Sequence, residues 1–123
     1  MSDDSVSLQR STPIFSVLDL QQALDWYQNV LGFEVAWTWG NPTSRASVCR
    51  DEVEVNLAMA PAEKAGMSAA YFVVTGVNAY HDLIMQAGGR IAATLGDRPY
   101  GMRDFSVLDP AGNELSFGES IVS

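Results

Sequence analysis

The stretch Val17-Leu-Asp-Leu-Gln-Gln-Ala-Leu-Asp-Trp-Tyr-Gln-Asn-Val-Leu-Gly32 has a second copy in the same chain, Val74-Thr-Gly-Val-Asn-Ala-Tyr-His-Asp-Leu-Ile-Met-Gln-Ala-Gly-Gly89. The copies are 57 positions apart, and the alignment places Asp25 on Asp82. In each copy an apolar, β-rich run precedes a helical pattern, and glycine follows it. A repeat in so short a chain predicts two pseudo-symmetric half-modules that build one shared cleft.

Each copy predicts the same order of elements. Asp19 is a good N-cap and Gln22 completes a capping-box-like pair, so we expect a helix over 20–31 that ends at Gly32. A second helix is expected over 77–87. The predicted strands are 12–18, 33–39, 44–49, 53–59, 69–75, 90–95, 102–108 and 114–118.

These elements predict an α+β fold of two tandem βαβββ modules. The modules cover about 12–60 and 69–119, within a single domain over 12–123. The polar, pattern-free residues 1–11 are expected to form a flexible N-terminal arm.

Composition excludes several classes of function. The 123-residue chain has a formal net charge of −8, which argues against binding to nucleic acid or anionic membranes. An acidic surface suits a cationic small molecule, or simply keeps the protein soluble. The chain has one cysteine, Cys49, no apolar run that could span a bilayer and no signal-peptide pattern at its start, so we expect a cytoplasmic protein.

Two groups of motifs resemble a known family. The run Pro13-Ile-Phe-Ser-Val-Leu-Asp-Leu20, with Trp26-Tyr27 and Val30-Leu-Gly-Phe-Glu34, resembles the opening module of the vicinal oxygen chelate superfamily. The run Tyr100-Gly-Met-Arg-Asp-Phe105, followed by Leu108-Asp-Pro-Ala-Gly-Asn-Glu-Leu115, resembles its terminal hairpin. Within the superfamily, the chain is most similar to the bleomycin-resistance and glyoxalase-like proteins.

That resemblance implies an arrangement in space. The two modules would form a curved mixed sheet with helices on its convex side and a cleft on its concave side. It also implies a homodimer, often with clefts near the subunit boundary. The resemblance leaves open whether modules are exchanged between subunits.

The family's metal site is not preserved. Superfamily enzymes usually hold a divalent metal through His, Glu or Gln at the starts of the first strands and in the last strands of the modules. Those positions fall here on Thr12, Asn56, Ala69 and Ser116. A divalent ion needs several imidazole or deprotonated ligands, so we expect no metal and no cofactor. If the alignment of the last strand of each module were shifted by two residues, the metal-ligand positions would hold Glu54 and Glu114. These are two carboxylates with no imidazole beside them.

No catalytic residues are predicted either. His81, the single histidine, lies at or beyond the edge of the apolar stripe of the second helix, so no Ser-His-Asp or Cys-His set can form within one chain. Cys49 is expected to act as a small buried hydrophobe. Asp109 and Gly112 are assigned to a structural turn, in which Asp109 accepts backbone hydrogen bonds and Gly112 supplies a positive φ.

The residues expected in the cleft follow from strand alternation and from the loop over 96–101, which in this superfamily often closes over the ligand. Val35, Trp37 and Trp39 are expected on one face, either as a stacking platform for a planar ligand or as a cover for the core or dimer interface. Arg103 is expected either to meet a ligand carboxylate or to pair with a neighbouring acid such as Asp104 or Glu114. The predicted ligand-binding residues are Ile14, Trp37, Trp39, Glu54, Asn56, Tyr71, Tyr100, Met102, Arg103 and Ser116.

Three functions are compatible with these features. The first is a metal-free small-molecule binding protein of the bleomycin-resistance type that sequesters a planar or cationic ligand. The second is a metal-dependent lyase, isomerase or dioxygenase of the same superfamily with atypical ligands. The third is a structural or regulatory dimer whose cleft is filled by Trp37 and Trp39.

Overall fold

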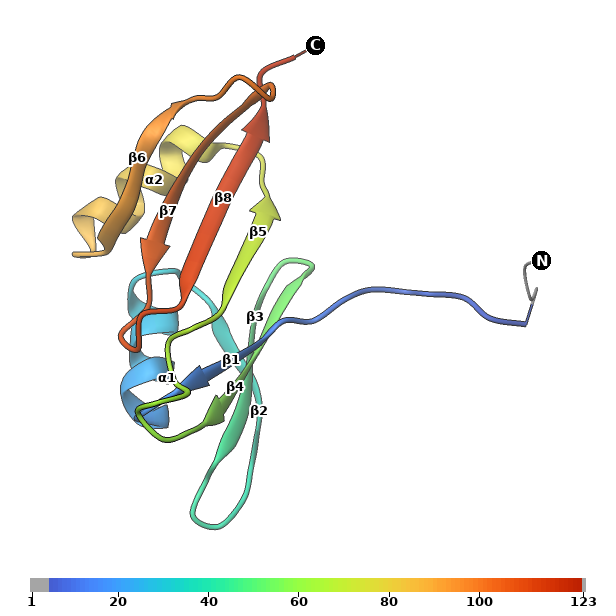
Figure 1. Cartoon of the computed structure of the whole chain (residues 1–123), viewed down its shortest axis with the longest axis vertical. Helices are drawn as coiled ribbons and strands as arrows, with labels where there is room; N and C mark the ends of the chain where they lie inside the picture. The colour runs from blue at the N-terminus through green and yellow to red at the C-terminus, as the bar shows by residue number, and fades with distance from the viewer. Residues whose placement is uncertain (1–4, 123) are drawn as a thin grey trace.

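The computed structural model describes residues 5–122 and contains the βαβββ order twice (Figure 1). The first module consists of β1 (Ile14–Val17), α1 (Leu20–Asn29), β2 (Glu34–Trp39), β3 (Arg45–Arg50) and β4 (Val53–Met59). The second consists of β5 (Ala69–Val73), α2 (Val77–Gln86), β6 (Arg90–Asp97), β7 (Met102–Leu108) and β8 (Glu114–Ser120). The predicted α+β order is confirmed. Of the expected N-terminal arm, residues 1–4 lie outside the described residues, and residues 5–11 form no helix or strand.

The strands form two four-stranded sheets, ordered β1-β4-β3-β2 and β5-β8-β7-β6. In each sheet the first strand pairs in parallel with the last, and the other pairs are antiparallel, so both sheets are mixed. Within residues 5–122 no ladder joins the sheets, which refines the expectation of one continuous curved sheet. Figure 1 shows the two sheets following one another along the long axis, with both helices to the left.

The helices begin through different caps. The Asp19 carboxylate accepts a hydrogen bond from the backbone N–H of Gln22 at 3.0 Å, which confirms the predicted N-cap of α1. Gly76 precedes α2 and has no side chain to serve as a cap. Instead Glu119, on β8, accepts from the backbone N–H groups of Gly76 and Val77, both at 3.1 Å. A carboxylate from another element therefore fixes the start of α2 on its sheet.

One face of each sheet supplies the hydrophobic core. On the first sheet this face carries Phe15, Val17, Val55 and Leu57, and on the second it carries Phe105, Val107, Leu115 and Phe117. These residues cluster with the buried residues of α1 and α2. The alternation of the strands directs their other side chains to the opposite face, which is called the open face below. None of the helices in the described part of the chain is long and apolar enough to cross a bilayer.

The turn between β7 and β8 holds the modules together. Oδ1 of Asp109 accepts from the backbone N–H groups of Ala111, Gly112 and Asn113, and Gly112 has a φ of 109°, as predicted for a structural turn. Oδ2 of the same carboxylate accepts from the Tyr27 hydroxyl on α1 at 2.9 Å. Asp109 is 1% exposed, so this contact between modules is shielded from water.

Candidate functional site

The open face of the first sheet presents an aromatic and polar row. Trp37 pairs with Ser47, Ser47 with Asn56, and Asn56 with Ile14, and residues directly opposite each other share a face. The next row begins with Trp39, opposite Arg45. The structure thus brings together five of the predicted ligand-binding residues on one face, since Glu54 also lies there, opposite Cys49.

A β-bulge corrects one expectation for this face. The pairing of β2 with β3 shifts between Val35 and Trp37, so that Val35 lies opposite the buried Val48. Val35 therefore points to the helix side, and Glu34, opposite Cys49, takes its place beside the tryptophans on the open face. The extra residue changes the alternation without changing the strand's extent.

Both tryptophans are accessible within one chain. Trp37 is 43% exposed and Trp39 is 67% exposed. Large apolar side chains that are exposed together usually mark a binding surface. Neither ring is buried in the chain's own core, so both present aromatic surface on the open face.

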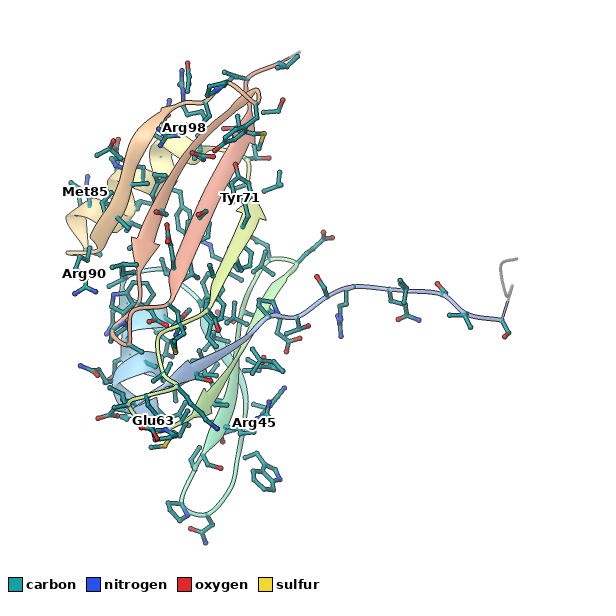
Figure 2. The ribbon with its side chains drawn as sticks, viewed as in Figure 1. Arg45, Glu63, Tyr71, Met85, Arg90 and Arg98 are labelled. Atoms are coloured by element: carbon teal, nitrogen blue, oxygen red, sulfur yellow. The ribbon has the colours of Figure 1, made fainter. Side chains whose placement is uncertain are left out.

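Some of the polar groups beside the tryptophans have hydrogen-bond partners within the described part of the chain, and others have none there. Ser47 donates a hydrogen bond to Glu54 at 2.5 Å. Among the described residues, the buried Nε of Arg45 and Oδ1 of Asn56 have no hydrogen-bond partner. Figure 2 shows Arg45 on the side of the first sheet away from α1. A buried polar atom without a partner is costly, and such atoms are usually satisfied by ordered water, an ion or a ligand.

The second sheet carries a cavity of about 490 Å³ over its open face. It brings together three of the predicted residues, Tyr71, Tyr100 and Ser116. It also contains two charged groups for which the sequence predicts no place in the cleft, Arg98 and Asp104. Tyr71 lies on β5, and Arg98 lies in the short turn between β6 and β7 (Figure 2).

Asp104 is the centre of a hydrogen-bonded cluster in this cavity. Its Oδ2 accepts from the hydroxyls of Tyr71 at 2.9 Å and Tyr100 at 2.5 Å, and its Oδ1 accepts from Nε of Arg98 at 2.7 Å. Burial disfavours the charged carboxylate, but hydrogen bonds from Arg98 and the two tyrosines outweigh it and hold the pKa of Asp104 below its ordinary value. Burial and the bond to Asp104 raise the pKa of Tyr71 to about 12. At neutral pH the cluster therefore contains an ionised carboxylate and neutral phenols.

Gly118 leaves the space through which the Tyr71 side chain reaches Asp104. Gly118 lies directly opposite Asp104 on β8, between the strand that carries Tyr71 and the strand that carries Asp104. A Cβ at residue 118 would overlap the Tyr71 hydroxyl. A side chain there would exclude the phenol from its present position, so glycine is required by a close approach.

Met102 and Arg103 are neighbours on β7, so they face opposite sides of the sheet. Met102 lies on the same side as Asp104 but does not line the cavity. Arg103 lies on the helix side and forms an ion pair with Asp97 at 2.6 Å. It therefore pairs with a neighbouring acid, as the structural alternative predicts, although the partner is Asp97 and not Asp104 or Glu114, and its place on the helix side does not support its assignment to the cleft. Residues 96 and 97 belong to β6, so the expected loop is a turn over 98–101.

The residues present do not fit the divalent metal that enzymes of this fold hold. Asn56 and Ser116 lie on the open faces of different sheets, where they offer an amide and a hydroxyl, and Ala69 offers no donor. Within residues 5–122, no group of three or more His, Cys, Asp or Glu residues is placed to hold a metal ion. His81 packs edge-on against Phe105 on the helix side of the second sheet, with ring centroids 5.1 Å apart.

A separate cavity of about 560 Å³ lies between the turn that joins β3 and β4 and the start of α2. The Arg50 guanidinium lies over the Tyr80 ring there, 5.0 Å from its centroid, and both side chains donate to the carbonyl oxygen of Leu31. None of the predicted ligand-binding residues lines this cavity.

Residues 12–117 match the model of the Glyoxalase/Bleomycin resistance protein/Dioxygenase superfamily, and the chain belongs to this family. Comparison with curated protein sequences finds no match.

Solved structures share the fold over almost the whole chain. A bleomycin-binding protein from bleomycin-producing Streptomyces verticillus, complexed with copper(II)-bleomycin, is 25% identical with a TM-score of 0.79, and the match covers 91% of this chain and 96% of that one. A glyoxalase/bleomycin resistance protein from Catenulispora acidiphila is 26% identical with a TM-score of 0.74, covering 89% and 96%. A bleomycin resistance determinant encoded on the transposon Tn5 is 13% identical with a TM-score of 0.79, covering 94% and 100%, and shows similarity of fold alone.

Proposed function

We propose that this chain is a small-molecule binding protein of the bleomycin-resistance type, which sequesters a planar or cationic ligand without a metal of its own. One observation carries the proposal. The open face of the first sheet presents Trp37 and Trp39 to solvent beside buried polar atoms of Arg45 and Asn56 that have no partner among the described residues. Such a face offers stacking area and a few fixed polar contacts, which are the usual components of a small-molecule site.

The charge of the chain supports a cationic ligand. The formal net charge is −8, and Glu34 and Glu54 flank Cys49 on the open face of the first sheet. Aromatic rings attract cations through their negative faces, so acidic and aromatic groups favour the same class of ligand.

A homodimer is part of the proposal. The open faces expose several large apolar side chains, among them Ile14 at 55%, Trp39 at 67% and Val73 at 73%. A second copy of the chain would cover part of this surface and complete each cleft. A cytoplasmic location is proposed as well, because the single Cys49 suits a reducing compartment.

The direct test is calorimetric titration with metal-free bleomycin in the presence of EDTA, followed by mass spectrometry of the recovered ligand. We expect saturable binding near one ligand per chain and recovery of the ligand unchanged. Turnover of a substrate that stops when EDTA is added would instead support a metal-dependent enzyme. Size-exclusion chromatography with light scattering measures the oligomeric state, and a monomer at micromolar concentration would contradict the dimer.

A further inference from the structure

The cavity over the second sheet has an unusual balance of donors and acceptors. A tyrosine hydroxyl has one proton to donate, and both Tyr71 and Tyr100 donate it to Asp104. Arg98 is largely committed, since its Nε donates to the Asp104 carboxylate and its Nη2 to the backbone oxygen of Thr94 at 2.5 Å and that of Asp104 at 3.1 Å, which leaves Nη1 to face a ligand. The tyrosine oxygens can therefore offer a ligand only their lone pairs.

Ser106 provides an independent sign that the cavity binds a polar group. This residue is 2% exposed, lines the cavity, and has a buried Oγ with no hydrogen-bond partner among residues 5–122. It lies between Ala93 and Ser116 in the sheet, so its side chain points to the open face. Buried hydroxyls in native proteins are almost always paired, either with protein groups or with ordered water, and the cavity is the side from which a partner would reach Ser106.

Glu114 gives the cavity over the second sheet a negative charge. It lines the same cavity, and in the described part of the chain its carboxylate has no hydrogen bond and no ion pair. The charges of Arg98 and Asp104 offset each other at 2.7 Å. The cavity therefore has a net negative charge from Glu114, with acceptor oxygens from Tyr71 and Tyr100 around it.

We infer that this cavity, lined by Tyr71, Tyr100, Ser106 and Glu114, is a subsite for an N–H-rich cationic group of the ligand, an ammonium or an amidinium. Such a group supplies a positive charge to Glu114 and several donors to oxygens that can only accept. A carboxylate or phosphate would face the negative charge of Glu114 and the tyrosine lone pairs, with Nη1 of Arg98 and hydroxyls such as that of Ser106 left to donate, so the cavity favours a cation over an anion. The inference rests on the proposed function and assigns the cationic part of the ligand to the second module.

The test is an NMR titration of the ¹⁵N-labelled protein with benzamidine, and with benzamide as a neutral molecule of the same shape. We expect benzamidine to shift the backbone signals of Ser106, Glu114 and Ser116, and to bind at least about fivefold more tightly than benzamide. Glu114→Gln should weaken benzamidine binding about fivefold and leave benzamide binding unchanged. Ser106→Ala, which removes a buried unpaired hydroxyl and should preserve the fold, should also weaken benzamidine binding.

The matched control is Glu63→Gln, the same change of charge on the linker between the modules (Figure 2). It should leave benzamidine binding unchanged. Equal binding of benzamidine and benzamide, or no effect of Glu114→Gln, would overturn the subsite.

Titration of the same variants with bleomycin separates the two proposals. Bleomycin binding that survives Glu114→Gln at full strength would overturn the subsite and leave the sequestering function intact. Benzamidine binding that depends on Glu114 supports the subsite even if bleomycin itself fails to bind.

Discussion

The Tyr71 hydroxyl lies 2.9 Å from Oδ2 of Asp104, two strands away across the second sheet, and it reaches that carboxylate across Gly118. The contact joins the first strand of the module to its third without any backbone pairing between them. It fixes the direction in which the Tyr71 oxygen presents its lone pairs to the cavity.

Replacing Gly118 should break this contact. Gly118→Ala places a methyl group where the Tyr71 hydroxyl now lies, so we expect the phenol to turn away and its pKa to fall from about 12 toward its ordinary value of 10. Spectrophotometric titration of the tyrosines measures the change, and Tyr71→Phe identifies the Tyr71 component of the curve. An unaltered titration curve in Gly118→Ala would show that the glycine does not control the contact.

The contact between modules at Tyr27 should contribute to stability. Tyr27→Phe removes the hydrogen bond to the buried Asp109 carboxylate and should lower the free energy of unfolding by about 2 kcal/mol. Urea denaturation measures the change. Tyr100→Phe, at a residue that is 64% exposed, is the matched control and should cost less. A Tyr27→Phe variant as stable as the parent would exclude this bond as a stabilising contact.

Stability should fall at alkaline pH, in part through Tyr80. Burial raises the Tyr80 pKa to about 12, although Arg50 opposes the shift, and the unfolded value is about 10. Because the folded pKa is the higher one, the contribution of Tyr80 is complete below pH 10 and is lost as the pH rises from about 10 to 12. Tyr80→Phe should therefore show a smaller loss of stability across that range in urea denaturation. Equal slopes for parent and variant would contradict this assignment.

Local sequence patterns predicted the elements well. Asp19 was recognisable as a cap because its side chain acts on the backbone three residues away. The cap of α2 was not recognisable from the sequence, because Glu119 comes from β8 and only the tertiary fold places it at Gly76. The open face was predicted except where the bulge after Val35 broke the alternation, and a bulge has no strong signature in a single sequence.

The Asp104 cluster was missed for a similar reason. Its members come from β5, β7 and the turn between β6 and β7, and the sheet order brings them together. One signal was present in the sequence. Arg103 and Asp104 are adjacent charges in a strand, so they must face opposite sides and need separate partners, which rules out Arg103 as the partner of Asp104.

The measurement that tests the central claim most directly is tryptophan fluorescence during titration with metal-free bleomycin in chelating buffer. Trp26, packed against Tyr27 with ring centroids 4.9 Å apart, serves as an internal reference on α1. We predict saturable quenching of the parent and of Trp26→Phe, and no quenching of the double variant Trp37→Phe/Trp39→Phe. Quenching that persists in the double variant, or a parent protein that shows none with bleomycin or with other planar cations, would contradict a sequestering site on the first sheet.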